Sequence, residues 1–451
     1  MPARPRLAVL PLLAVVGVGL VLSVIQVLSY PRLSPIDELS HLDYMLRSPT
    51  LLDPGDKVGQ DAMHIQACRG VDAEGFDPNP CKRGTVYDPD VYQESGYNTA
   101  ATNTPIYYAA DRAVAEVIRV ATPVDSLFIA GRMAGGLWLA LGVVLTALAG
   151  RRMGVGMLPL AGVLGLVVAS PATTYASATV TPDALGLVVG AVVLLAALRW
   201  EERPTKARAA VLVAVAAIVA LIKLTNFVVV AAVALYLLLN RARAARSETD
   251  TGHAATPPVS GRSRTVVALA TGAFALFAAA AWTVSSNARN HQDPDDLPDM
   301  ATRFAVDAFP WRGLFDNAFS LAQPLQSPWV SVGDPTLMFF SNTLAHLVLT
   351  AGLVAAALFV TDRRRETLLA RSLLVAAVVF SLGLVVLGYA TSQMYFPLPN
   401  RYGVAIVAPA AVVTASMLRS RISVGVVLTL AVLAATVSVV RLAGLPWVPP
   451  T

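Results

Sequence analysis

The most regular feature of the chain is a series of long apolar stretches separated by shorter polar segments. Leu, Val and Ala dominate each stretch. A helix of about 20 such residues crosses the roughly 30 Å hydrocarbon core of a bilayer. We therefore predict eleven membrane-spanning helices, at residues 7–29, 127–149, 153–170, 181–198, 207–222, 224–239, 265–285, 341–361, 371–390, 403–418 and 423–440.

The composition excludes a water-soluble globular protein. Hydrophobic residues make up 55% of the 451 residues and charged residues only 14%, a balance typical of multi-spanning membrane proteins. The run at 7–29 follows Arg4 and Arg6, but it is long enough to cross a bilayer and lacks an Ala-x-Ala exit, so we expect it to be retained. The net charge of +5 does not indicate a nucleic-acid partner, because the arginines are spread over short loops.

The basic residues assign each loop to one side of the membrane. Cytoplasmic loops carry an excess of Lys and Arg, and the basic clusters alternate with the predicted spans. The pattern predicts an all-α protein of the plasma membrane, with a cytoplasmic N-terminus, an outer C-terminus and a single polytopic domain over residues 1–451. The clusters are Arg4/Arg6, Arg151/Arg152, Arg199/Arg203/Lys206/Arg208, Arg241 to Arg264, Arg363/Arg364/Arg365/Arg371 and Arg419/Arg421.

The same alternation settles two ambiguous segments. Residues 207–239 must form two helices that are broken at Lys223, since a single helix would reverse every basic cluster that follows. Residues 105–122 must not cross the membrane, and we expect an amphipathic helix at the interface instead. The residues that we place along one polar stripe of this helix are Asp111, Arg112, Glu116 and Arg119.

Two long outer loops, residues 30–126 and 286–340, hold most of the acidic residues under this topology. The cytoplasmic segment 240–264 has the composition of a flexible linker. The only two cysteines, Cys68 and Cys81, both lie in the first outer loop. Because the outer compartment can be oxidising, we predict that they form a disulfide.

The densest group of ionisable residues is "SPIDELSHLDY", residues 34–44, directly after the first apolar run. Three interpretations stay open. Asp37 and Glu38 can cap a helix N-terminus, where acidic groups are favoured. Together with His41 they can hold a divalent cation such as Mg²⁺, Mn²⁺ or Ca²⁺. A carboxylate here can also act as a general base at the membrane surface.

The order of several short motifs resembles a known superfamily. "SPIDELSHLDY", "NTPIYY" (103–108), "SPATTYASATVTPDAL", "LIKLTNF" and "NRYGVAIVAPA" follow one another on the predicted outer face. They resemble the GT-C superfamily of polyprenyl-phosphate-dependent glycosyltransferases. The closest resemblance is to a poorly characterised family of bacterial membrane proteins with a Pro-Asp-Glu-x-x-His-x-x-Tyr box. The resemblance implies a GT-C-like fold and a role in the cell envelope.

In that superfamily an acidic residue of the first outer loop is the catalytic base, and a sugar is transferred with inversion from a polyprenyl phosphate. The resemblance therefore implies that Asp37 is the base, with Glu38 as its partner or substitute. His41 would orient the acceptor or help to bind an ion, and Asp43 and Tyr44 would line the same wall. The partners implied are a lipid-linked sugar donor and an envelope glycan or lipid acceptor, with membrane lipids around the helices.

A lipid phosphate also requires cations at the same depth. Arg401 is the first candidate, because a guanidinium group can bind phosphate through two hydrogen bonds, and Tyr402 could add a third. Lys223 is the second candidate, although its ammonium group could equally extend to the lipid headgroups. Arg289 and His291 open the second outer loop and are further candidates for donor or acceptor binding.

Two other functions compete with an enzyme. A transporter or flippase of lipid-linked precursors would carry charged or broken helices near the bilayer midplane, whereas the ionisable residues here cluster at the outer helix ends. A subunit that keeps the GT-C-like fold without activity is the other alternative. The Asp-Glu-x-x-His box and the Arg401-Tyr402 pair favour the enzyme over such a subunit.

Overall fold

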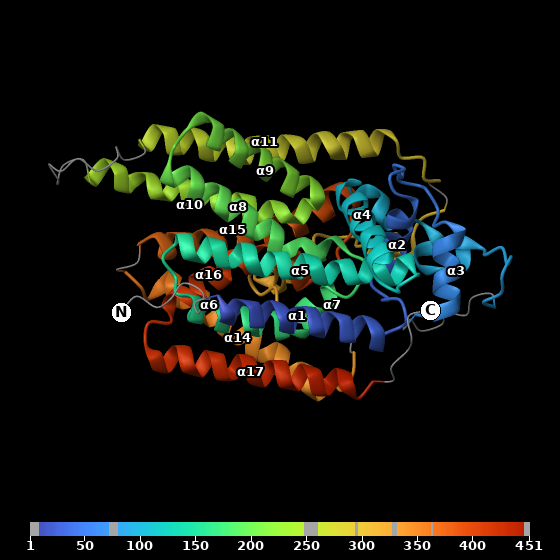
Figure 1. Ribbon diagram of the computed structural model, residues 1–451. Helices are drawn as coiled ribbons and strands as arrows, with labels where there is room; N and C mark the ends of the chain where they lie inside the picture. Colours follow the sequence, from blue (N-terminus) through green and yellow to red (C-terminus); the bar gives the residue numbers. More distant parts are fainter. Residues whose placement is uncertain are drawn as a thin grey trace.

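The computed structural model describes residues 9–71, 80–247, 260–293, 296–326, 332–361 and 364–445. Within these ranges the chain forms helices and three isolated β-bridges, with no β-strand. The long helices run side by side along one axis, and the short helices α2, α3 and α4 gather at one end of them (Figure 1). The predicted all-α class is therefore confirmed for the described residues.

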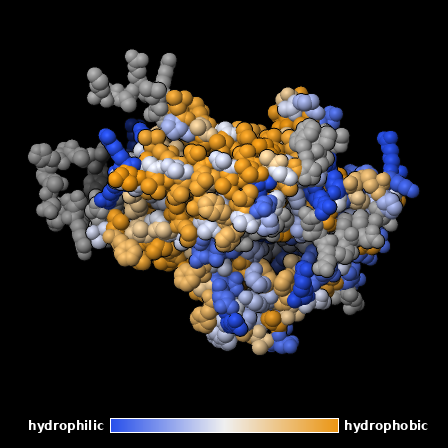
Figure 2. Space-filling model, turned by 90° about the horizontal axis from the view of Figure 1, so that it is seen from below, coloured by the Kyte–Doolittle hydropathy of each residue, from blue (hydrophilic) through white to orange (hydrophobic). Residues whose placement is uncertain are grey.

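Seven of the described helices are long and apolar enough to cross a membrane, so the protein is a multi-pass α-helical membrane protein. Apolar side chains cover most of the helical part of the face in Figure 2. Exposed Phe274 and Phe277 on α11 illustrate such a surface, which a bilayer would cover. The seven helices are α1 (Leu10–Ser29), α5 (Leu127–Arg152), α8 (Gly186–Glu202, preceded by the 3₁₀ turn η4, Pro182–Leu185), α11 (Gly261–Ala288), α14 (Pro335–Leu358), α15 (Arg364–Ser392) and α17 (Arg421–Ala443).

The other four predicted spans also coincide with helices, but these are shorter or less apolar. They are α6 (Met157–Ala169), α9 (Lys206–Ile222), α10 (Phe227–Ser247) and α16 (Val407–Met417). The 11 residues of α16 extend only about 16 Å at about 1.5 Å per residue, and all but Met417 are buried. This helix lies inside the bundle and is too short to span a bilayer alone. The count of eleven spans therefore stays a prediction.

Ion pairs bring several of the basic clusters to the same end of the bundle, which we call the arginine end. Glu201, near the end of α8, is buried and accepts hydrogen bonds from Arg264 of α11 and Arg365 of α15. Its neighbour Glu202 pairs with Arg152 at the end of α5. Helix α1 begins and α17 ends at opposite ends of the bundle (Figure 1). The predicted alternation of basic loops therefore agrees with the packing, while the side of the membrane stays a prediction.

The opposite end, which we call the loop end, holds the two predicted long loops. The first contains α2 (Glu38–Arg47), α3 (Gln60–Arg69), three 3₁₀ turns (η1, Pro89–Val91; η2, Gln93–Gly96; η3, Thr99–Thr102) and α4 (Ile106–Ala121). The second contains α12 (Asp299–Arg303), α13 (Trp311–Asp316) and the turn η6 (Ser320–Ala322). Two further elements contact these loops. Helix α7 (Pro171–Ala176) does so through the hydrogen bond of Tyr175 to Ser34, and the 3₁₀ segment η7 (Asn400–Ile406) packs against η6.

Salt bridges join the two loops. Arg289 Nε lies 2.6 Å from Asp53 Oδ1, and Lys57 Nζ lies 3.1 Å from Asp296 Oδ2. Arg303 Nη2 lies 2.9 Å from Glu94 Oε1. In addition, the predicted disulfide between Cys68 and Cys81 is present in the first loop. The three salt bridges tie sequence segments more than 200 residues apart into one polar cap over the helices.

Three local predictions can be compared with the structure. The break at Lys223 is confirmed, because α9 ends at Ile222 and Lys223 is extended before the turn η5 (Leu224–Asn226). The helix predicted at 105–122 is α4, but its polar stripe was partly wrong. Asp111 is buried and accepts a hydrogen bond of 2.8 Å from Trp138 of α5, because it faces the bundle and not the surface.

The predicted cytoplasmic linker begins later than expected. Helix α10 continues to Ser247, and α11 already begins at Gly261. Residues 248–259, the centre of the predicted linker, lie outside the described residues.

Candidate functional site

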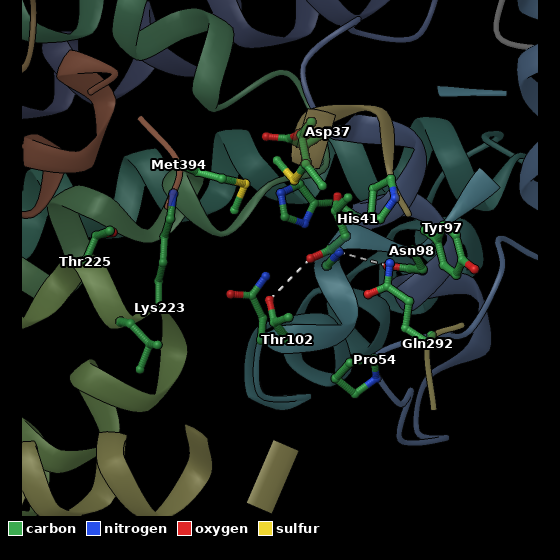
Figure 3. Close-up of a pocket in the computed structure, with 18 of the residues that line it drawn as sticks. Asp37, His41, Pro54, Tyr97, Asn98, Thr102, Lys223, Thr225, Gln292 and Met394 are labelled. Atoms are coloured by element: carbon green, nitrogen blue, oxygen red, sulfur yellow. Dashed lines mark hydrogen bonds between the residues drawn. The ribbon is translucent and has the colours of Figure 1, made fainter. Parts of the chain in front are cut away.

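A cavity of about 510 Å³ lies at the loop end, between the polar cap and the helix ends. Asp37, His41, Lys223, Arg401 and Tyr402 line it, so five of the predicted site residues share one space. His41, Asn98 and Gln292 lie on one side of the cavity, and Lys223 and Thr225 lie on the other (Figure 3). Apolar side chains complete the lining, among them Leu224, Leu297, Met300, Ala301 and Met394.

Asp37 occupies the N-cap position of α2 in an unusual backbone conformation. Its φ of 58° and ψ of 0° are left-handed, a region that Asp tolerates better than most residues and that is enriched at functional sites. The side chain makes no capping hydrogen bond. Instead, its Oδ2 accepts a hydrogen bond of 2.7 Å from Arg401 Nη2, across 364 residues of sequence. A helix-capping role therefore does not explain the position of the Asp37 carboxylate.

Arg401 continues a row of alternating charges that we call the charge chain: Asp37, Arg401, Asp183 and Lys223. The second guanidinium nitrogen, Nη1, lies 3.9 Å from Asp183 Oδ2. On the far side of Asp183, Lys223 Nζ lies 2.5 Å from Oδ1. The ring of Tyr402 lies beside both cations, 5.0 Å from Lys223 Nζ and 5.7 Å from the Arg401 guanidinium carbon. Two cations are thus held side by side at the cavity wall.

The Asp183 carboxylate does not cap the helical turn in which it lies. Thr181 Oγ1 accepts from the Asp183 backbone N–H and so provides the cap of η4. This leaves the Asp183 carboxylate, which is almost fully buried, to pair with Lys223. Buried charges are tolerated when they are paired, so Asp183 explains why Lys223 is stable at this depth.

The charge chain lowers the pKa of Asp37. Burial by itself raises the pKa of this carboxyl group, but the positive charge of Arg401, with smaller contributions from His41, the Arg401 hydrogen bond and Lys223, outweighs it. Asp37 is therefore ionised at neutral pH. Asp37 is a weak base as long as it stays paired with Arg401.

His41 comes from the second turn of the same helix and is held by two residues of the "NTPIYY" motif. Its Nδ1 lies 2.8 Å from the hydroxyl of Tyr108, and that hydroxyl accepts a hydrogen bond of 3.2 Å from Asn103 Nδ2. Burial lowers the pKa of His41 to about 4, with Lys223 and Arg401 acting in the same direction and Asp37 and Asp183 opposing it. The imidazole is therefore neutral at pH 7.

Glu38 points away from the cavity and into the protein. Its two oxygens accept hydrogen bonds from Arg132 Nε at 2.8 Å and Arg132 Nη2 at 2.6 Å. They also accept from the backbone N–H groups of Ser34 and Val180. Both residues of this pair are almost fully buried. With four donors around it, Glu38 ties the first loop to α5 and is not placed to share the work of Asp37.

The predicted ion site is not assembled. Among the described residues, the only group of three or more His, Cys, Asp or Glu side chains close enough to share an ion is His64, Cys68 and Cys81. The two sulfur atoms of that group are joined in the disulfide. Asp37, Glu38 and His41 do not form such a group, because Glu38 turns toward Arg132 while Asp37 turns toward Arg401.

Four other predicted residues lie outside the cavity lining. Asp43 is buried and binds Asn98 Nδ2 at 2.7 Å and the Gly59 N–H at 2.9 Å. Tyr44 stacks on Tyr108, with ring centroids 4.1 Å apart. Arg289 and His291 are at the contact between the loops, beside Asp53 and Asp56 respectively. These residues hold the walls of the cavity in place.

Sequence reasoning missed several residues that the structure connects to the site. Arg132 is a lone charge five positions into an apolar helix, and this position was a usable signal, since such a charge needs a buried partner. Asn103 and Tyr108 belong to the "NTPIYY" motif, but the sequence assigned neither residue a role of its own. Gln292, Leu297 and Met394 carry no recognisable pattern.

Comparison of the chain with protein-family models, with curated proteins and with solved structures finds no match.

Proposed function

We propose that this protein is an inverting glycosyltransferase of the GT-C type. It would transfer a sugar from a polyprenyl-phosphate donor to a cell-envelope glycan or lipid at the outer face of the membrane. The observation that carries the proposal is the meeting of Asp37 and Arg401 in one cavity at an end of the helix bundle. A carboxylate and a phosphate-binding cation are the two groups that such a transfer needs within one cavity.

The cavity suits an amphipathic donor. Arg401 and Lys223 provide two positive charges for the phosphate, and the guanidinium group can bind two of its oxygens at once. Apolar side chains of the lining, such as Leu224, Met300 and Met394, suit the first isoprene units. Asn98, Asn103 and Thr102 supply amide and hydroxyl groups of the kind that bind sugar hydroxyls.

In the proposed reaction Asp37 takes the proton of an acceptor hydroxyl. The oxygen attacks the anomeric carbon from the face opposite the phosphate, and a new carbon–oxygen bond forms. The bond between the anomeric carbon and the phosphate oxygen breaks, and the polyprenyl phosphate leaves with the electron pair. Arg401 and Lys223 stabilise the charge that grows on the leaving phosphate.

Donor binding would also activate the base. Arg401 is paired with Asp37 in the cavity, which keeps the pKa of Asp37 low. A bound phosphate competes for the same guanidinium group, and its own negative charge raises the pKa of the neighbouring carboxylate. Asp37 would therefore become a stronger base when the donor is in place.

A transporter of lipid-linked precursors would require a different arrangement. Its polar groups would lie near the bilayer midplane, on broken helices of repeated halves. The charge chain and the cavity lie at the loop end of the bundle, where the helices meet the polar cap. This position favours chemistry at the membrane surface.

The test is a comparison of two variants in nanodiscs with a panel of polyprenyl-phosphate sugars and isolated envelope acceptors. Asp37→Asn keeps the size of the side chain but removes the base, so turnover should fall roughly 10²- to 10⁴-fold while donor still binds. Arg401→Ala should weaken donor binding, and Arg401→Lys should restore only part of it.

Matched controls are Asp61→Asn and Arg312→Ala, the same changes at exposed positions outside the cavity. Both should leave turnover and donor affinity unchanged. If Asp37→Asn folds, binds donor and transfers sugar at the parental rate, Asp37 is not the base. If the parental protein moves lipid-linked sugar across the membrane without forming a glycosidic bond, the transport alternative replaces the enzyme.

A further inference from the structure

The contacts of His41 determine where its ring proton lies. Tyr108 is fully buried, and its hydroxyl has two polar neighbours within hydrogen-bond distance, Asn103 Nδ2 and His41 Nδ1. The amide nitrogen of Asn103 can only donate. The single proton of the Tyr108 hydroxyl therefore has one acceptor in reach, the Nδ1 atom of His41. A buried hydroxyl proton without an acceptor is costly in free energy, so this direction is strongly preferred.

An Nδ1 atom that accepts a hydrogen bond carries no proton. A neutral imidazole has one N–H, which must then be at Nε2. His41 lines the cavity together with Asp37, Lys223 and Arg401. The Tyr108 hydroxyl occupies Nδ1, which leaves Nε2 as the ring's free hydrogen-bonding atom for a ligand.

We infer that Asn103 and Tyr108 lock His41 in the Nε2–H form, so that His41 acts as a neutral hydrogen-bond donor to a phosphate oxygen of the bound lipid. The identity of the phosphate rests on the proposed function, whereas the position of the proton does not. His41 then acts neither as a general base nor as a metal ligand through Nδ1. Asn103 and Tyr108 are positioning residues, which act through the imidazole without transferring a proton themselves.

The local charges agree with this assignment. The charges of Asp37 and Asp183 favour the positively charged ring with two protons, while those of Lys223 and Arg401 disfavour it. Burial disfavours this charged form most strongly. A second proton would also have to break the hydrogen bond that Tyr108 donates to Nδ1. The imidazole thus adds a hydrogen-bond donor beside two cations without adding a third positive charge.

The proton position can be measured without an activity assay. In the full-length protein labelled with ¹⁵N-histidine and reconstituted in lipid, protonated and unprotonated ring nitrogens give well-separated NMR signals. The chain has five histidines, and His41→Gln identifies the signals of His41 by their loss. At pH 7 we expect Nδ1 of His41 to be unprotonated and Nε2 to be protonated. A protonated Nδ1 would overturn the inference.

Tyr108→Phe tests the lock itself. Loss of the hydroxyl removes the hydrogen bond that stabilises the neutral ring, so the pKa of His41 should rise and its Nδ1 signal should shift toward the protonated position. The matched control is Tyr107→Phe, which removes a neighbouring hydroxyl that accepts from the Thr181 N–H and does not contact His41. The control should leave both ring nitrogens as they are in the parental protein. Equal effects of the two variants would contradict the lock.

The role of the Nε2–H group is tested by two amide substitutions. The side-chain nitrogen of Gln reaches close to the Nε2 position of His, while that of Asn reaches only to Nδ1. His41→Gln should therefore keep most of the affinity for a polyprenyl phosphate without sugar, and His41→Asn should lose about 10- to 100-fold, as expected for a hydrogen bond to a charged group. Equal affinities of the two variants would refute the donor role.

The two proposals fail in distinguishable ways. A ring protonated at Nδ1 in a protein that binds polyprenyl phosphate refutes the inference and leaves the proposed function standing. A ring protonated at Nε2 in a protein that binds no polyprenyl phosphate supports the lock but counts against the proposed function.

Discussion

At the residue scale, the site is built from charges that are paired with one another, and two of them, Arg401 and Asp183, are buried. Asp37 and Asp183 alternate with Arg401 and Lys223 along the charge chain, and each carboxylate lies within reach of a cation. Buried ion pairs contribute little to net stability because desolvation offsets their attraction. Their presence at this cavity is therefore better explained by binding or chemistry than by folding.

The first prediction concerns the acid limb of the pH–rate profile. The pKa of Asp37 lies below its usual value of 3.8 because of Arg401, so the parental enzyme should keep its kcat/KM as the pH falls from 8 to about 5. In Arg401→Ala, burial still raises the pKa of Asp37, but its main opposing charge is gone. The rate should then fall with decreasing pH within this range. Equal profile shapes for both proteins would show that Asp37 is not the group that titrates.

The second prediction concerns Glu38 and Arg132. Removing one partner of a buried pair leaves an unpaired charge and costs about 3–5 kcal/mol, so Glu38→Gln and Arg132→Met should each lower the thermal midpoint strongly. The double variant should lose less than the sum of the two single losses. Thermal unfolding in detergent measures all three. Strictly additive losses would indicate that the pair is not coupled.

The grouping of residues in one cavity was predictable where local sequence and charge were sufficient. Asp37, Arg401 and Lys223 could be grouped because each is a charge at the end of an apolar run on the same predicted face. The sequence could not show which of the adjacent carboxylates, Asp37 or Glu38, faces the cavity. The directions of the two side chains are set only when the loop folds. The left-handed backbone of Asp37 turns one carboxylate to the cavity and leaves the next one facing Arg132.

At the element scale, the position of Arg401 depends on how closely η7 approaches α8. A Cβ atom at Gly190 would meet the carbonyl oxygen of Ala405, and one at Gly186 would lie 2.6 Å from the side chain of Val404. Gly403 itself lies against the carbonyl oxygen of Leu321. Glycines at these contacts allow the segment that carries Arg401 and Tyr402 to lie directly on the helix.

The third prediction follows from this contact. Gly190→Ala should push η7 away from α8 and displace Arg401, and a displacement of about 1 Å can cost on the order of 10²-fold in rate. Gly272→Ala in α11 is the matched control, because nothing lies within 4 Å of its added Cβ. Turnover and the thermal midpoint of both variants should be compared. Parental turnover of Gly190→Ala would show that this contact does not position the site.

Elements were the most predictable level of the structure. Each apolar run coincides with a helix, and the break at Lys223 was found from the alternation of basic clusters alone. Helix ends were less predictable, as α10 shows by its extension to Ser247. The polar contacts of α4 were mistaken at Asp111, because the partner Trp138 lies on another helix and leaves no trace in the local pattern.

At the scale of the whole molecule, the chain separates its charges between two ends. The arginine end joins Arg152, Arg264 and Arg365 to Glu201 and Glu202, and the loop end carries the polar cap and the cavity. The order of basic loops was enough to predict this separation. The number of full crossings stays a prediction, because a buried short helix such as α16 is as apolar as a spanning one.

The fourth prediction assigns the two ends to the two sides of the membrane. Single cysteines at exposed positions, Val86→Cys at the loop end and Ala207→Cys at the arginine end, can be introduced into a Cys68→Ser/Cys81→Ser background. Because basic loops stay in the cytoplasm, a membrane-impermeant thiol reagent added to intact cells should label position 86 and not position 207. Position 207 should react once the cells are opened, which controls for its accessibility. The reverse labelling would place the cavity in the cytoplasm, where a transfer to an outer envelope acceptor could not take place.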